Sequence, residues 1–215
     1  VDGAYTVGQL ITVTVQFSEV VTVTGTPILT LETGVTDRQA SYTAGSGTDT
    51  LQFAYTVQAG DTSSDLDYVS TSALALNGGS IRDAALNAAN LTLVGPGTPG
   101  SLGGNKALVI DTTAPPAPAL TSPANGSSIT SAAWTLIDWS DVIDPFPITY
   151  IYQASFSPTV DITGAFTAPI YTSVPLAISE IPTGPNPENT CYWHVRAVDS
   201  AGNSSVWSPV WSVTV

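Results

Sequence analysis

The chain has 215 residues, of which 17 are acidic and only 4 are lysine or arginine, which gives a formal net charge of -13. Four scattered basic residues cannot neutralise a row of phosphates, so nucleic acid is excluded as an expected partner. Only 10% of the residues are charged and 43% are hydrophobic, which excludes a disordered polyelectrolyte and predicts sizeable buried cores.

The first half of the chain alternates apolar and polar residues in short runs. The run Leu10–Phe17 alternates well enough to be a half-buried strand. Clusters of glycine, proline, threonine and aspartate separate the runs about every 8–12 residues, which is typical of an all-β sandwich. Residues 69–76 fit either a strand or a short helical turn. The other predicted strands are Ile28–Leu31, Ala40–Thr43, Leu51–Val57 and Ala107–Ile110.

A proline-rich segment follows Ile110, near the middle of the chain. It starts with Asp111 and two threonines and continues with Pro115, Pro116 and Pro118. Proline has no backbone donor and fixes its own φ, so a sheet ladder ends here and a stiff connection begins. We therefore predict two β-sandwich domains, residues 1–111 and 119–215, joined by a linker over residues 112–118.

The second half repeats the strand pattern and holds all five tryptophans. In the strand that begins at Cys191, alternation places Cys191 and Trp193 in the core and points His194 outward to solvent. The predicted strands are Trp134–Trp139, Ile148–Ala154, Cys191–Val198 and Val210–Val215. The fold class is therefore all-β, with two immunoglobulin-like or fibronectin III-like sandwiches in tandem.

Several motifs run through the whole first half: Asp2–Gly8, Val15–Glu19, Ala59–Asp61, Ile81–Asn87 and the joint Asp111–Pro115. In combination they resemble an immunoglobulin-like, cadherin-like repeat of very large bacterial surface adhesins. That family usually has glycine before the asparagine of the fourth motif, whereas this chain has Leu86. The resemblance implies a non-catalytic extracellular module whose partners are neighbouring domains of the same polypeptide or neighbouring subunits.

The second half resembles a fibronectin type III domain. The residues that carry the resemblance are Trp139, the strand Trp193–Val198, the turn Asp199–Asn203 and the closing segment Trp207–Val215. The tyrosine usual in that strand would fall at Cys191. Either the corner before the strand is held differently here, or Tyr192 takes that role in a shifted register.

The acidic residues concentrate in loops that a sandwich would bring to its two poles. Ca²⁺ takes roughly six to eight oxygen ligands, and adjacent carboxylates repel unless a cation joins them. Turn formation alone is the alternative, because aspartate and asparagine bond their own backbone. The predicted structural calcium ligands at the joint are Asp61, Asp65, Asp67, Asp111, Asp199 and Asn203, and a second set at the N-terminal pole comprises Asp2, Glu19, Asp83 and Asn87.

The residues give little support for an enzyme. His194 is the only histidine, and no serine–histidine–aspartate set can be built around it. Cys191 has the inward parity of a buried apolar residue and has no activating base at a defined spacing. We therefore expect no catalytic activity.

The expected function is that of a calcium-stiffened spacer in a large bacterial surface protein, secreted or at the cell surface. Low cysteine, no methionine and few lysines suit that location, and no apolar run is long enough for membrane insertion. One alternative is a carbohydrate-binding module that stacks surface glycans on aromatic residues. Another is a filament subunit that exchanges strands at an open sheet edge. The aromatic candidates are Trp134, Tyr150, Trp207 and Trp211.

Overall fold

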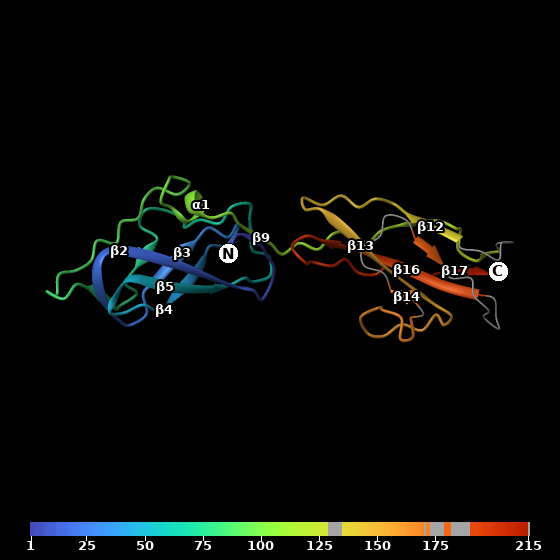
Figure 1. Cartoon of the computed structure of the whole chain (residues 1–215), viewed down its shortest axis with the longest axis horizontal. Helices are drawn as coiled ribbons and strands as arrows, with labels where there is room; N and C mark the ends of the chain where they lie inside the picture. Colours follow the sequence, from blue (N-terminus) through green and yellow to red (C-terminus); the bar gives the residue numbers. More distant parts are fainter. Residues whose placement is uncertain (129–134, 170, 173–178, 182–189, 215) are drawn as a thin grey trace. The chain divides into compact units, whose positions relative to one another are not determined.

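A computed structural model describes residues 1–128, 135–169, 171–172, 179–181 and 190–214 (Figure 1). The chain divides into two compact units, Val1–Thr112 and Thr113–Val215. Both consist of β-strands packed as sheets, so the all-β prediction is confirmed. Among the described residues, no helix is long and apolar enough to span a bilayer.

The first domain packs a six-stranded sheet, in the order β7-β3-β4-β5-β2-β8, against a three-stranded sheet in the order β1-β9-β6. Its one helix, α1, spans Leu102–Asn105. The strands are β1 (Gly3–Tyr5), β2 (Leu10–Thr24), β3 (Ile28–Leu31), β4 (Arg38–Ala44), β5 (Thr48–Thr56), β6 (Thr62–Ser63), β7 (Leu74–Ala75), β8 (Ser80–Arg82) and β9 (Leu108–Asp111).

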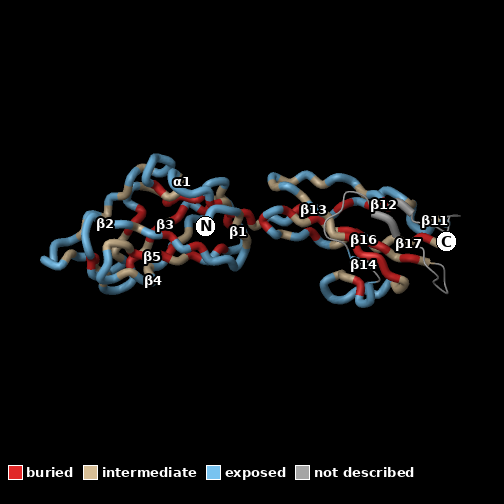
Figure 2. The backbone as a smooth tube through the Cα atoms, in the orientation of Figure 1, coloured by how far each residue is buried: buried red, intermediate tan, exposed pale blue. Residues whose placement is uncertain are grey.

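Alternation along the strands builds the first core. In β2, Ile11 and Val13 are buried and Thr12 and Thr14 are exposed, because successive side chains point to opposite faces of a sheet. Figure 2 shows buried and exposed stretches following one another along the tube. The segment 69–76 contains a turn, closed by the Ala73 N–H on the Ser70 carbonyl, and then the short strand β7.

The described residues of the second domain form a three-stranded sheet, β10-β12-β15, and a five-stranded sheet, β11-β17-β16-β13-β14. Its core contains Ile137, Tyr152, Trp193 and Val195, which are all nearly inaccessible to solvent. The strands are β10 (Leu120–Ser122), β11 (Ser127–Ser128), β12 (Thr135–Trp139), β13 (Ile148–Ser155), β14 (Tyr171–Thr172), β15 (Ser179–Ile181), β16 (Thr190–Asp199) and β17 (Trp211–Thr214).

Two serines complete the hydrogen bonding of β16 after β17 leaves it. β17 pairs with β16 only from Thr190 to Trp193. Beyond that point the Ser208 hydroxyl accepts the Val195 N–H at 3.0 Å, and the Ser205 hydroxyl accepts the Ala197 N–H at 2.9 Å. Both serines are buried, so their side chains satisfy strand donors that burial would otherwise leave unpaired.

His194 corrects the sequence prediction. It was expected to face solvent, but it is fully buried, whereas the predicted burial of Cys191 is confirmed. The His194 ring lies between Phe166, at a centroid distance of 4.2 Å, and Trp207, at 4.1 Å. The outward face of β16 is therefore covered by two segments that are not strands of its sheet. Strand alternation predicts the direction of a side chain and not what covers it.

Candidate functional site

Asp199 ends β16 and closes a turn with Asn203. The Asp199 carboxylate accepts the Asn203 backbone N–H at 2.9 Å with one oxygen and the Asn203 side-chain amide at 2.9 Å with the other. The Asp199 N–H donates to the Asn203 carbonyl at 3.1 Å, and Gly202 has a φ of 98°. Turn chemistry therefore holds both predicted residues in place.

The first domain contains the same turn at Asp83 and Asn87. The Asp83 carboxylate accepts the Asn87 backbone N–H at 2.8 Å and its side-chain amide at 2.7 Å. The side-chain bond from Asn87 is the main reason that the pKa of Asp83 lies below its usual value. Leu86, in the place of Gly202, takes a φ of 71°. The turn thus forms without the glycine usual in the adhesin repeat, at the cost of placing a leucine in a left-handed conformation.

Replacing Leu86 with glycine is expected to raise the free energy of unfolding of the first domain by about 0.5–1 kcal/mol. The left-handed conformation costs a non-glycine residue roughly 1–2 kcal/mol, and glycine's extra freedom in the unfolded chain takes back part of that gain. Leu86 is 71% exposed, so little packing is lost. Differential scanning calorimetry of L86G measures the effect. The matched change G202A is expected to lower the free energy of unfolding of the second domain. A lower free energy of unfolding in L86G would contradict the backbone strain at Leu86.

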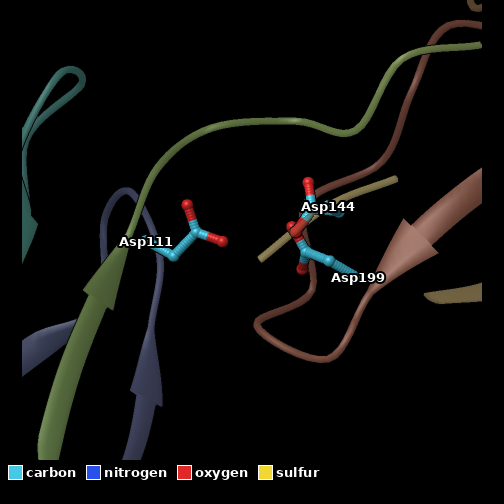
Figure 3. Close-up of side chains that lie close together, drawn as sticks. All are labelled: Asp111, Asp144 and Asp199. Atoms are coloured by element: carbon cyan, nitrogen blue, oxygen red, sulfur yellow. The ribbon is translucent and has the colours of Figure 1, made fainter. Parts of the chain in front are cut away.

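Asp144 lies beside Asp199, and the sequence analysis did not single it out. The two carboxylates have oxygens within 4.8 Å of each other, and Figure 3 shows their side chains meeting. Asp144 also accepts the Phe146 N–H at 2.9 Å. The loop 140–147 leads into β13, whose first residue, Ile148, pairs with Asp199. The loop-position reasoning that placed the Asp199 turn could have found Asp144 as well.

Asp111 is the last residue of β9 (Figure 3). In the ladder it lies opposite Thr62, the first residue of β6. The Thr112 hydroxyl donates to the Asp61 carbonyl at 2.8 Å and accepts the Gly60 N–H at 3.1 Å. The predicted loop around Asp61 therefore lies at the end of the first domain from which the chain leaves, as the loop order predicts.

The Asp61 side chain turns into its own domain. It is 1% exposed and accepts Arg38 Nε at 2.8 Å, the Gln58 N–H at 2.9 Å and the Tyr55 hydroxyl. Burial opposes ionisation, but the bonds from Tyr55, Arg38 and Gln58 outweigh it and hold the pKa of Asp61 below its usual value. Both carboxylate oxygens thus have partners in the protein.

Asp65 and Asp67, the other predicted ligands of this loop, differ in environment. Asp67 is buried and accepts the Tyr68 N–H at 2.8 Å and the Gly97 N–H at 2.9 Å. Burial disfavours its charge, but these donors and the Ser101 hydroxyl keep the pKa of Asp67 below its usual value. Asp65 is exposed. Within the described residues, none of Asp61, Asp65 and Asp67 belongs to a group of three or more metal-ligating side chains.

The second predicted set is divided between two places. Glu19, Asp83 and Asn87 line one cavity of about 470 Å³, between β2 and the segment that follows β8. Asp2 is not among the lining residues. Its carboxylate accepts the Ala107 N–H at 3.3 Å, just before β9. The structure therefore brings three of the four residues to one surface.

The proposed sugar-stacking aromatics pack within the second domain. Trp207 stacks on His194, and the Arg196 guanidinium lies 4.9 Å from the Trp207 ring centroid. The imidazole and the guanidinium therefore already contact the indole ring on which a sugar would have to stack. Trp211 packs edge-on against Trp193, and Tyr150 against Trp139. Trp134 lies outside the described residues.

No protein-family model matches the chain, and no curated protein matches it. Among solved structures, the fibronectin(III)-like modules of CbhA from Clostridium thermocellum align with a TM-score of 0.40 at 12% sequence identity. The alignment covers 100% of this chain and 89% of that chain. A likeness at that level adds nothing to what the geometry shows.

Proposed function

We propose that this chain is a non-catalytic spacer module of a bacterial surface protein, secreted or exposed on the cell. Its two β-sandwiches are joined by a proline-rich connection that needs no cofactor to be extended. Calcium bound by Asp144 and Asp199 stiffens the module further. Neighbouring domains of the same polypeptide or neighbouring subunits are the expected partners.

The pairing of Asp144 with Asp199 is the observation that carries the calcium proposal. Two carboxylates within 4.8 Å repel each other unless a proton or a cation lies between them. Arg196 is the only lysine or arginine in residues 113–215, and its guanidinium lies over Trp207. The second domain therefore has no other basic side chain that could neutralise this pair. A hard divalent cation, which prefers oxygen ligands, suits the two carboxylates.

Calcium needs more oxygens than two aspartates supply, and backbone carbonyls and water would complete the shell. Asp61 and Asp67 are left out of this proposal because, among the described residues, neither belongs to a group of three or more metal-ligating side chains.

Calcium is expected to raise the free energy of unfolding of the second domain by about 1.5–2.5 kcal/mol. The estimate assumes a Kd of about 10⁻⁴–10⁻³ M, as in extracellular modules, and about 10 mM calcium. Tryptophan fluorescence isolates this domain because all five tryptophans belong to it. Thermal melts in calcium and in EGTA measure the difference.

The variant D144N tests the site in this experiment, and it should lose most of the calcium response. D141N, in the same loop and exposed, is the matched control and should respond like the unmodified chain. An unchanged calcium response in D144N would refute the site, and the absence of any response to calcium would refute the stiffening role.

A further inference from the structure

A short hairpin, residues 157–167, lies between β13 and β14 in the second domain (Figure 1). It is closed by the bridge between Val160 and Phe166 and by the Thr167 N–H, which donates to the Thr159 carbonyl at 3.0 Å. Within these residues, all of which the structure describes, Phe166 alone is buried. The hairpin therefore has no core of its own, and an isolated hairpin is marginally stable in water.

The hairpin is held against the domain through His194. The ring of Phe166 stacks on the imidazole at a centroid distance of 4.2 Å. The Phe166 N–H donates to Gln153 Oε1 at 3.0 Å, and His194 Nε2 lies 3.0 Å from the same atom. Gly164 lies so close to Trp207 that an added Cβ would be 3.1 Å from the indole ring. The hairpin thus covers the imidazole directly.

These hydrogen bonds determine which nitrogen of His194 carries the proton. A backbone N–H only donates, so the Gln153 atom that meets the Phe166 N–H is the amide oxygen. That oxygen only accepts, and therefore His194 Nε2 donates to it and carries the ring proton. Among the described residues, His194 Nδ1 is buried and has no hydrogen-bond partner. A second proton would lie on Nδ1, where burial leaves it no acceptor.

The charges around the imidazole also oppose a second proton. Burial is the main reason that the pKa of His194 is lowered, and the charge of Arg196 adds to it. Asp161 is the only acidic residue of the hairpin, but it is exposed and its carboxylate accepts the Thr163 N–H at 2.7 Å. The titratable and charged groups of the described elements around the ring are Arg196 and Tyr192 on the same face of β16, Asp161 on the hairpin, and Cys191 and Asp199 on the core face of β16.

We propose that the hairpin 157–167 is an acid-operated lid, which protonation of His194 releases from β16 while the sheets of the second domain stay folded. Release gives the imidazole water as a hydrogen-bond partner. It also exposes the rings of Phe166, His194 and Trp207 as one aromatic surface. The Ser155 hydroxyl, which donates to the Ala168 carbonyl at 2.9 Å, keeps the base of the lid in place.

The open fraction of the lid is expected to rise about 50-fold between about pH 7 and 4.5. Under the closed lid the pKa of His194 is about 4, and under the open lid it returns to about 6.5. Above about pH 6.5 neither form binds the second proton, so opening does not depend on pH. Between the two values only the open form binds it, and acid therefore favours opening. Below about pH 4 both forms bind it and the effect levels off.

Hydrogen exchange of the Phe166 amide measures the opening, because its bond to Gln153 joins the lid to β13. After correction for the intrinsic pH dependence of exchange, its protection factor should fall about 50-fold between about pH 7 and 4.5. The Val195 amide, bonded to the buried Ser208 hydroxyl, reports unfolding of the sheet and should stay better protected at both pH values. Equal protection of the two amides would overturn the proposal, because the lid would then open only with the whole domain.

Two variants assign the effect to His194. H194F keeps an aromatic ring in the stack and has no titrating nitrogen, so protection of the Phe166 amide should not change with pH. D161N is the matched control, because the asparagine oxygen can still accept the Thr163 N–H, and it should keep the 50-fold change. Protection that is independent of pH in the unmodified chain would overturn the proposal. The same pH dependence in H194F, or its loss in D161N, would overturn it as well, since another group would then operate the lid.

Discussion

Lowering the pH from about 6.5 to about 4.5 is expected to reduce the free energy of unfolding of the second domain by about 2–3 kcal/mol. The cause is His194. Burial, with a further contribution from the charge of Arg196, lowers the pKa of His194 to about 4 in the folded protein. The imidazole therefore stays neutral in the folded domain through this range, while in the unfolded chain it binds a proton.

The direction follows from proton binding in the two states. Below about pH 6.5 the unfolded chain takes up a proton that the folded domain refuses, so stability falls as the pH falls towards 4. Above about pH 6.5 neither state is protonated, and the contribution is fully present. Denaturant titrations followed by tryptophan fluorescence measure the profile in this domain alone, because all five tryptophans belong to it.

The variant H194F separates this effect from the titration of carboxyl groups. Phenylalanine keeps the stack between Phe166 and Trp207, and Gln153 keeps the Phe166 N–H at 3.0 Å as a partner. The profile of H194F should be nearly flat between about pH 6.5 and 4.5. A profile as steep as that of the unmodified chain would show that His194 is not the group responsible.

Removing the Asp61 carboxylate is expected to cost the first domain about 3–5 kcal/mol. In D61A the Arg38 guanidinium loses its ion pair, and the Tyr55 hydroxyl and the Gln58 N–H lose their acceptor. Tyr55 is nearly inaccessible to solvent, so water cannot replace the lost partner. Calorimetry of the variant measures the loss.

Calcium distinguishes the two roles that Asp61 has been given. If Asp61 serves as a partner of Arg38 and Tyr55, D61A should lower the free energy of unfolding by the same amount in calcium and in EGTA. If Asp61 is a metal ligand, the loss in D61A should grow with the calcium concentration. The exposed neighbour Asp65 is the matched control, and D65A is expected to change stability by less than about 0.5 kcal/mol. A small effect of D61A without calcium would contradict the structural role.

The fold was predictable because its signals are local. Alternation in Leu10–Phe17, turn residues between runs and prolines after Ile110 each depend on a few neighbouring residues. What covers a strand depends on distant residues. Phe166 and Trp207 bury His194 from positions 28 residues before it and 13 after it. No pattern within β16 contains that information.

The same distinction between local and distant partners applies to the candidate site. The turns at Asp83 and Asp199 could be predicted, because an aspartate bonding an asparagine four residues later is local chemistry. The environment of Asp61 could not, since Arg38 lies 23 residues away, on β4. Asp144 lies 55 residues before Asp199, and only the order of the loops connects the two. Counting acidic residues in a loop does not show whether their oxygens already have partners.

The parallel pairs β1–β9 and β11–β17 determine how each domain would respond to being pulled. In the first domain β1 is the first strand and β9 the last. In the second domain β11 is the second described strand and β17 the last, and the two strands of each pair run in the same direction. Tension on the two ends draws these strands past each other along their length. All the hydrogen bonds of the pair are then strained together, rather than opened one at a time as when a hairpin is unzipped. Each sandwich is therefore arranged to bear load in shear.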